Sequence, residues 1–241
     1  GGRREPLNLH AVITGNPGTG KTSLAPLLGE IYAALGVLDT GHVVMADRSA
    51  LVAGFTGQTA IKTNELCDRA MGGVLFVDEA YALKQSDDDA FGDEAIVTLL
   101  KRVEDDRGKF ACVVAGYKDE MFRFMSANSG MASRFPSQFH FEDYTAGELL
   151  EIFRRLVESS GRRLEPAALE RARGHFEAKV ARKTKNFANG REARNLVDET
   201  LRRMNQRLSA AGREPGRDEL EIILADDLPA HGPPPGATIA Q

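Results

Sequence analysis

Cysteine and long apolar segments are scarce in this chain of 241 residues. The two cysteines, Cys67 and Cys112, lie in apolar surroundings with no second Cys or His at metal-ligand spacing, so we expect reduced thiols buried by packing. No apolar run reaches the roughly 18 residues that a membrane-spanning helix needs, and no signal peptide opens the sequence. These absences predict a cytoplasmic protein without a membrane segment.

An excess of positive charge is also missing. The net charge of −4 at pH 7 and the pI of about 5.8 make nucleic acid an unexpected partner for the whole chain. The five histidines are scattered, and no Ser-His-Asp or Cys-His arrangement points to covalent catalysis. The sequence has no initiating Met, and its start at Gly1-Gly2-Arg3-Arg4 indicates a cut or processed end.

Short apolar runs alternate with amphipathic stretches through the first half of the chain. The apolar runs predict strands at 10–14, 42–46, 74–77, 110–115 and 139–141. Helical spacing predicts helices at 21–35, 59–71 and 93–104. Such alternation favours an α/β fold with a parallel, three-layer sheet, and the strand at 74–77 is apolar throughout, as helices on both faces require.

The composition changes after Thr145. From there to Gly212 the sequence shows helical periodicity and no strand pattern, while 220–224 reads as a short edge strand or a last turn. We therefore predict four segments: an α/β domain at 1–145, a small all-helical lid domain at 146–213, a short terminal element at 214–228 and a flexible tail at 229–241.

A glycine-rich loop joins the first predicted strand to the first predicted helix. It fits the pattern G-x-x-x-x-G-K-[ST], in which backbone amides and a helix N-terminus cradle phosphates. Lys21 is expected to reach the β- and γ-phosphates, and the Thr22 hydroxyl to ligate Mg²⁺. ATP and Mg²⁺ are thus the predicted cofactors. The predicted phosphate-binding residues are Gly15, Asn16, Pro17, Gly18, Thr19, Gly20, Lys21, Thr22 and Ser23.

Two carboxylates, Asp78 and Glu79, follow the apolar strand at 74–77. The carboxyl ends of parallel strands share one edge of the sheet, which is also where the phosphate loop opens. We expect Asp78 to hold Mg²⁺, directly or through water, and Glu79 to activate the attacking water as general base.

Further segments make the chain resemble a known family. They occupy residues 14–22, 57–63, 70–81, 115–117, 133–135 and 187–191. On these segments the sequence, from about Leu9 to Leu208, resembles the CbbX and SpoVK branch of the AAA+ proteins. The best-known member of that branch is the red-type rubisco activase, and the C-terminal motor of the type VII secretion ATPase EccA is similar. The resemblance implies a P-loop ATPase that works as a homo-hexameric ring and remodels or partly threads a protein client.

The resemblance also implies roles for residues outside the phosphate loop. Phe55, Thr56 and Gly57 match an aromatic pore loop that grips polypeptide, with a buried loop Phe as the alternative. Arg134 matches the arginine finger that reaches the neighbouring subunit's γ-phosphate, with a surface arginine as the alternative.

Three more positions take roles from the same resemblance. Arg191 matches the sensor-2 arginine of the lid, with Arg194 as a rival and a lid salt bridge as the alternative. Tyr117 stands where many AAA+ proteins carry the sensor-1 Asn, so another group would position the water.

Two charged segments carry weaker signals. Asp87-Asp88-Asp89 could form a cation site, but no ligand spacing accompanies it, and a solvated loop is the expectation. The basic residues at 162–185 lack the interleaved aromatics of a nucleic-acid reader, which favours ion pairs and solvated helix faces. Two other functions stay open beside the remodelling ATPase: an ATP-gated assembly or scaffolding module, and a nucleic-acid-directed AAA+ protein.

Overall fold

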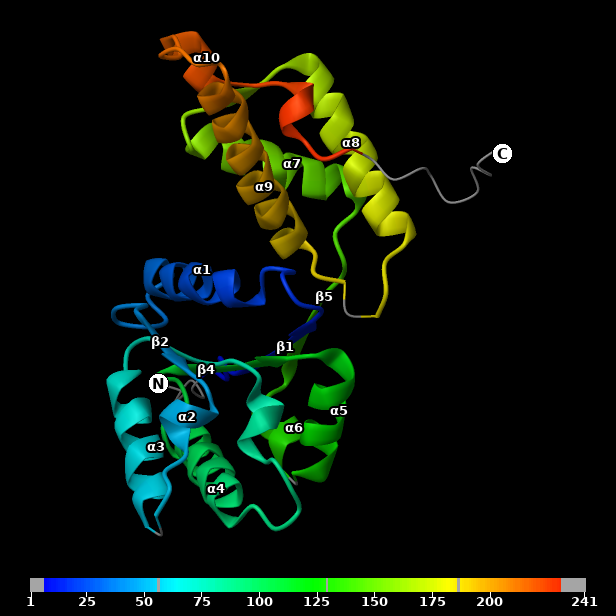
Figure 1. The fold of residues 1–241 in the computed structure, drawn as a ribbon. Helices are drawn as coiled ribbons and strands as arrows, with labels where there is room; N and C mark the ends of the chain where they lie inside the picture. The colour runs from blue at the N-terminus through cyan, green and yellow to red at the C-terminus, as the bar shows by residue number, and fades with distance from the viewer. Residues whose placement is uncertain (1–6, 56, 129, 186, 231–241) are drawn as a thin grey trace, which may run out of the picture. The chain divides into compact units, whose positions relative to one another are not determined.

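The chain folds into two compact units in this computed structural model, which describes residues 7–55, 57–128, 130–185 and 187–230. Unit 1 comprises residues 1–16 and 20–142, and unit 2 comprises residues 17–19 and 143–241. Figure 1 shows the helices and strands of each unit. The three residues 17–19 of the phosphate loop therefore group with the second half of the chain.

Unit 1 is built on a parallel sheet of five strands in the order β2-β3-β4-β1-β5. The strands are β1 (Ala11–Gly15), β2 (Val43–Ala46), β3 (Val74–Val77), β4 (Ala111–Gly116) and β5 (Ser137–Phe141). The α/β prediction is confirmed, with β5 two residues longer at its start than the sequence pattern indicates. The acidic pair follows β3 and the phosphate loop follows β1, with β4 between these two strands in the sheet.

The helices of unit 1 connect these strands. They are α1 (Lys21–Ala34), α2 (Arg48–Leu51), α3 (Gln58–Arg69), the 3₁₀ turn η1 (Ala80–Leu83), α4 (Ala90–Asp105), α5 (Lys118–Ala127) and α6 (Met131–Arg134). The short helices α2, α5 and α6 were not predicted from the sequence. Helix α4 begins three residues earlier than predicted, because Asp89 caps it by accepting a hydrogen bond from the Gly92 amide.

The side chains of the central strands divide strictly by face, because successive residues of a strand point to opposite sides. Val12, Leu75 and Val114 face the cluster that α2 to α6 cover, whereas Ile13 and Phe76 face the cluster that α1 covers. Figure 1 shows α1 on one side of the sheet and α3 to α6 on the other. The core is thus a three-layer one with most of its helices on one face.

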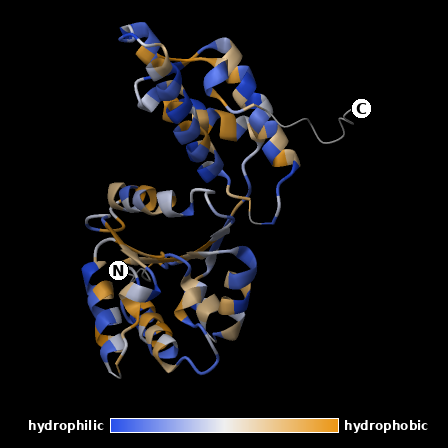
Figure 2. Cartoon of the chain, in the orientation of Figure 1, coloured by the Kyte–Doolittle hydropathy of each residue, from blue (hydrophilic) through white to orange (hydrophobic). Residues whose placement is uncertain are grey.

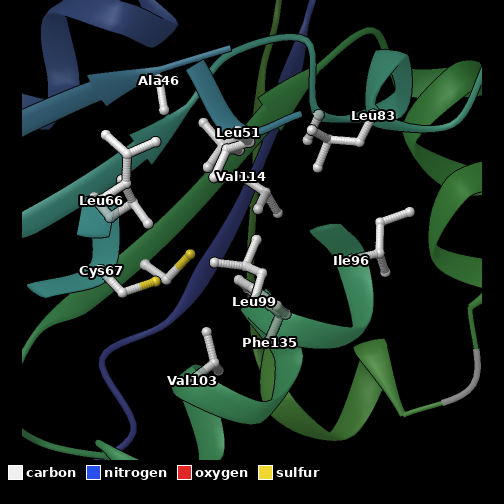
Figure 3. Packing of buried hydrophobic residues seen from close by; sticks show 14 of the residues in the cluster. Ala46, Leu51, Leu66, Cys67, Leu83, Ile96, Leu99, Val103, Val114 and Phe135 are labelled. Atoms are coloured by element: carbon white, nitrogen blue, oxygen red, sulfur yellow. The ribbon is translucent and has the colours of Figure 1, made fainter. Parts of the chain in front are cut away.

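Close packing in the larger cluster is visible in Figure 3, where Leu66 and Cys67 of α3 and Leu99 of α4 lie around Val114 of β4. Cys67 and Cys112 are both buried free thiols, as expected. Burial raises the pKa of the Cys67 thiol to about 11, so it stays protonated at neutral pH.

Unit 2 packs three long helices, α7 (Ala146–Ser159), α8 (Pro166–Ala181) and α9 (Gly190–Ala210), with the short elements α10 (Arg217–Glu221) and η2 (Ala225–Asp227). Thr145 and Glu148 form a capping box at the start of α7, which explains why helical structure begins where the composition changes. Figure 2 shows apolar and polar residues alternating along these helices, as expected for helices that each bury one face.

The prediction of no strand between 145 and 212 is wrong at two residues. Arg163–Leu164 forms β6, which pairs in parallel with Ile222–Ile223, the strand β7. Ile223 and Leu228 are buried in the same core as α7, α8 and α9. Ile223 and Leu228 therefore contribute to the helical core of unit 2. Among the described residues, no helix is both long and apolar enough to cross a membrane.

Candidate active site

The phosphate loop closes around the ammonium group of Lys21. Its Nζ donates to the carbonyl oxygen of Gly15 at 2.8 Å and to that of Asn16 at 2.9 Å, and the side chain is largely buried. Gly20 caps α1 in a left-handed conformation (φ 94°), which glycine adopts without strain. The loop thus has the curvature that the sequence pattern predicts, with the α1 N-terminus behind it.

The phosphate loop and the acidic pair converge at Thr22 and Asp78. The Thr22 hydroxyl donates to Oδ2 of Asp78 at 3.4 Å, although the two residues are 56 positions apart. Both side chains carry oxygen ligands of the kind that Mg²⁺ prefers, so the pair fits the predicted ion. The site residues predicted from the two motifs are therefore brought together by the sheet.

Glu79 adopts a backbone conformation that is unusual for a residue with a side chain. Its φ of 48° and ψ of 44° lie in the left-handed region, which costs a non-glycine residue about 1–2 kcal/mol. The Glu79 amide donates to Oδ1 of Asp78 at 3.0 Å, and its carbonyl oxygen accepts from the Ala82 amide at 2.7 Å. The carboxylate is exposed, so substrate and water can reach it. Backbone strain of this kind concentrates at functional sites.

Tyr117 lies beside the phosphate loop in unit 1. The Nζ of Lys21 is 5.5 Å from the centre of its ring, a cation–π distance, and the ring also contacts Tyr81 at 5.8 Å between centroids. Burial raises the pKa of the Tyr81 hydroxyl well above its usual range, so Tyr81 is uncharged at neutral pH. The structure thus places the residue at the end of β4 next to the lysine of the site.

A pocket of about 400 Å³ opens beside the acidic pair. Its lining residues are Asp47, Arg48, Ser49, Val52, Asp78, Glu79, Ala82 and Gln85. Arg48 and Asp89 were not recognised as site neighbours from the sequence. Arg48 pairs with Asp89 at 2.6 Å, and this ion pair lowers the pKa of the Asp89 carboxyl to about 2.

The three acidic residues at 87–89 differ in their exposure to solvent. Asp87 and Asp88 are exposed, as expected of a solvated loop, but the Asp89 side chain is only 8% exposed because it caps α4 and pairs with Arg48. The expectation of a solvated loop is therefore wrong for Asp89. No cluster of three or more metal-ligating side chains is found in the described part of the chain.

Within unit 2, Asn189 and Tyr144 hold residues 17–19 of the loop. The buried Asn189 side chain donates from Nδ2 to the Pro17 carbonyl oxygen at 3.3 Å and accepts from the Tyr144 amide at 2.8 Å. The Tyr144 hydroxyl donates to the Thr19 carbonyl oxygen at 3.0 Å, and the Gly190 amide donates to that of Gly18 at 3.0 Å. The sequence shows Asn189 as a helix breaker within a family motif, but not this contact.

Arg191 and Arg194 begin α9, one turn apart on the same face, and both are exposed. The Arg191 amide donates to the Ala188 carbonyl oxygen at 3.0 Å. Neither side chain makes an ion pair within the residues that the structure describes, so no lid salt bridge of Arg191 is seen there. Both remain candidates for the sensor-2 role.

Arg134 ends α6 and is partly buried, with 29% of its side chain exposed. Its Nη1 donates to the Gly130 carbonyl oxygen at 3.1 Å, and its Nε lies 3.6 Å from a carboxylate oxygen of Glu104. That Nε has no hydrogen-bond partner in the described ranges. Arg134 is therefore held loosely by its own chain.

Phe55 lies between α2 and α3 with 72% of its surface exposed, which excludes the alternative of a buried loop residue. Gly57 caps α3 with a φ of 81°. Thr56, the middle residue of the predicted pore loop, lies outside the described residues.

Comparison with known proteins agrees with this geometry. Residues 11–143 match the family described as "ATPase family associated with various cellular activities (AAA)", and residues 145–234 match the AAA lid domain. The chain belongs to the AAA family. It is an ATPase, and its nucleotide-binding half and its lid correspond to the two matched segments.

Two curated relatives place the chain more narrowly, and one solved structure shares its fold. It is 38% identical to stage V sporulation protein K of Bacillus subtilis over 221 residues, which cover 91% of this chain and 68% of that protein. It is 37% identical to the chloroplastic ribulose bisphosphate carboxylase/oxygenase activase of Cyanidioschyzon merolae over 229 residues, which cover 92% and 74%. The FIGL-1 AAA domain in complex with ADP matches with a TM-score of 0.65 at 17% identity, covering 91% of this chain and 69% of that one. The family resemblance inferred from the sequence is confirmed.

Proposed function

We propose that this AAA ATPase hydrolyses ATP with Mg²⁺ held by Thr22 and Asp78 and uses the energy to remodel or partly thread a protein client, as a homo-hexameric ring. The observation that carries the proposal is the approach of the Thr22 hydroxyl to Asp78, in the first turn of the helix that Lys21 begins. These three groups come from both motifs and lie at one edge of the sheet. Mg²⁺, when bound, would supply positive charge to the phosphate oxygens.

The residues of the chain divide the chemistry among them. Lys21 exchanges the Gly15 and Asn16 carbonyl oxygens for phosphate oxygens, which attract its charge more strongly. Glu79 takes a proton from the attacking water, because its exposed carboxylate follows the metal-binding Asp78 directly. Tyr117, beside Lys21, orients the phosphates or the water in place of a sensor-1 Asn.

The ring places one catalytic group in a neighbouring subunit. Arg134 is loosely held by Glu104 and Gly130, so little is lost when it turns toward the γ-phosphate bound by the next subunit. An arginine finger of this kind accelerates related nucleotidases by about 10³–10⁵. Arg191 or Arg194, at the start of α9, would take the sensor-2 role that the family resemblance implies.

The proposed client is a protein. The relative from Cyanidioschyzon merolae is named as an activase of another enzyme, which is a protein substrate. The exposed Phe55 fits a residue that grips a polypeptide, because a large aromatic side chain supplies apolar contact area at low entropic cost. Hydrolysis would then move this loop against the bound chain.

The test is the ATPase rate measured against protein concentration for wild type, Glu79→Gln and Arg134→Ala. A ring with shared sites gives a steep rise with concentration that either substitution abolishes. A 1:1 mixture of the two inactive variants should then recover about a quarter of the wild-type rate, because half of the subunits keep Glu79 and half of their neighbours supply Arg134.

Other outcomes would contradict the proposal. A flat rate that is indifferent to Arg134, with no recovery in the mixture, would indicate a nucleotide-gated assembly module without a shared site. Stimulation by DNA that disappears with added salt would indicate a nucleic-acid-directed protein. A Phe55→Ala variant that is stimulated by reduced, carboxymethylated α-lactalbumin as strongly as wild type would contradict gripping by this loop.

A further inference from the structure

Arg48 connects three elements of unit 1 through one guanidinium group. Its Nη1 lies 2.6 Å from Oδ2 of Asp89, and its Nη2 donates to Oδ1 at 3.3 Å, so the pair is bidentate. The same Nη1 also donates to the carbonyl oxygens of Leu83 and Ala82, the latter at 3.4 Å. The planar fork of arginine suits such a set of acceptors, and a lysine ammonium could not reproduce it.

On one side this contact holds the turn that carries Glu79. Ala82 and Leu83 are the last residues of η1, and Glu79 is its N-cap. The Ala82 amide donates to the Glu79 carbonyl oxygen at 2.7 Å, so the left-handed conformation of Glu79 depends on the position of η1. By holding the far end of this four-residue turn, Arg48 keeps Glu79 in a conformation that is strained in isolation.

On the other side Arg48 begins the segment that leads to Phe55. It is the first residue of α2, and Phe55 follows the last residue of α2 by four positions. α3 holds the same segment separately: Nζ of Lys62 donates to the Ser49 and Val52 carbonyl oxygens, and the Thr63 hydroxyl donates to that of Leu51 at 3.1 Å. The segment therefore has one attachment to α3 and another, through Arg48, to the Glu79 turn.

We propose that Arg48 is a positioning residue that links the Glu79 turn to the Phe55 loop, so that a change at the hydrolysis site shifts the loop. Arg48 and Glu79 line the same pocket, and Asp89 anchors the guanidinium to the N-terminus of α4. A pair that served only to cap α4 would not need the two η1 carbonyls. The inference rests on the proposed function in that Phe55 grips the client, but the link itself requires no client.

A tryptophan introduced by substitution can report this link. The chain contains no tryptophan of its own, so the fluorescence would come from the new residue alone. We suggest Phe55→Trp in the full chain, with emission recorded at saturating Mg²⁺–ADP and at saturating Mg²⁺ with a non-hydrolysable ATP analogue. The emission maximum should differ between the two nucleotides. Adding Arg48→Met should remove that difference while the Kd of each nucleotide changes less than about threefold, since Lys21 and Thr22 are untouched.

Steady-state kinetics give an independent readout. Arg48→Met in the otherwise wild-type chain should lower kcat about 10- to 100-fold with little change in KM for ATP, as expected when a catalytic group is misplaced by a fraction of an ångström or more. Arg48→Lys should recover only part of the loss, because it cannot form the bidentate pair.

Two matched variants guard against a general loss of structure. Asp89→Asn keeps an N-cap for α4 but removes the charge that holds Arg48, so it should reproduce the loss of the nucleotide response. Lys62→Met removes two of the hydrogen bonds between the same α2 segment and α3 without touching η1, so it should retain the response. Thermal melting confirms that each variant is folded.

The outcomes separate this inference from the function proposed above. An unchanged tryptophan response in Arg48→Met and Asp89→Asn would overturn the link, as would an equal loss in Lys62→Met. The absence of any nucleotide response in Phe55→Trp alone would also overturn it. None of these results depends on a client or on Arg134. The concentration dependence of the ATPase rate, in contrast, tests the shared ring site and does not test the link through Arg48.

Discussion

The Thr22 hydroxyl donates a hydrogen bond of 3.4 Å to Asp78, which joins the first helix to the end of the third strand at the point where the phosphate loop closes. Both oxygens are proposed Mg²⁺ ligands, so their spacing sets how the ion is held. Removing one of these two ligands should therefore weaken the binding of Mg²⁺ more than the binding of the nucleotide.

Thr22→Ala should raise the Mg²⁺ concentration needed for half-maximal ATPase activity on the order of 10- to 100-fold, by analogy with changes around other metal sites. Thr22→Ser keeps the hydroxyl and should stay within about threefold of wild type. Activity measured against Mg²⁺ at fixed ATP checks this. Equal Mg²⁺ requirements for the Ala and Ser variants would show that the hydroxyl does not contact the ion.

Glu79 should show a conflict between stability and activity. Its φ of 48° strains any residue with a side chain, and glycine relieves that strain. Glu79→Gly should therefore be more stable than Glu79→Gln by about 1 kcal/mol, while both variants lose hydrolysis. Guanidinium chloride unfolding of the two variants measures the difference. Equal stabilities would mean that the surrounding turn relaxes on substitution.

Asn189 should be sensitive to a change of a single atom. Its Nδ2 donates to Asp143 at 2.9 Å, to Phe187 at 2.9 Å and to Pro17, so Asn189→Asp replaces three donor contacts by repulsion. We expect a loss of about 2–3 kcal/mol, the cost of buried groups left without partners. Asn189→Gly keeps the unusual backbone conformation (φ 50°, ψ −123°) and serves as the comparison. If urea unfolding shows that Asn189→Asp is as stable as Asn189→Gly, the result would contradict the role of the Nδ2 contacts.

Two helix glycines should respond in opposite directions to alanine. A Cβ on Gly29 would lie 2.0 Å from the Gly41 carbonyl oxygen, whereas a Cβ on Gly147 would have no heavy atom within 4 Å. Gly29→Ala should therefore lower the unfolding free energy by about 2–4 kcal/mol, as overpacking against backbone does. Gly147→Ala should raise it by about 0.5–1 kcal/mol through helix propensity. Thermal denaturation of both variants decides whether close packing or propensity governs each site.

The buried His10 makes unit 1 sensitive to mild acid. Its Nδ1 accepts from the Cys112 amide at 2.9 Å and its Nε2 lies 3.1 Å from the Val103 carbonyl oxygen, so the ring is neutral. Burial lowers the pKa of His10 to about 4 from 6.5. The unfolded state therefore binds the proton more readily, and this contribution to stability is complete above pH 6.5 and is lost as the pH falls toward 4.

Lowering the pH from 7 to 5 should thus cost about 2 kcal/mol through His10 alone. His10→Gln should be less stable at pH 7 and should lose about 2 kcal/mol less than wild type between the two pH values. Guanidinium chloride unfolding at pH 7 and pH 5 gives both quantities. Parallel pH dependences in the two proteins would assign the acid sensitivity to other groups.

Short sequence patterns were sufficient to predict those parts of the structure that depend on interactions between residues close together in the sequence. The spacing of Gly15, Gly20 and Lys21 predicts the loop because only glycine adopts the backbone that the turn needs, and apolar runs predict strands because a parallel sheet buries both faces. The capping box at Thr145 likewise marks a helix start through contacts within four residues. Short elements such as α5 and α6 escape prediction, because their helical form depends on packing against neighbours.

The sequence by itself determined the α/β fold and the ATPase family, and it predicts the residues proposed to carry the ATP chemistry, because all of these follow from motifs of adjacent residues. Only the tertiary structure decided which distant groups meet them. Asp87, Asp88 and Asp89 look alike in the sequence, yet Asp89 alone lies where α4 begins and where Arg48, 41 residues away, reaches it. Asn189 contacts Pro17 across 172 residues. Such contacts depend on how whole elements pack, which no short stretch of sequence encodes.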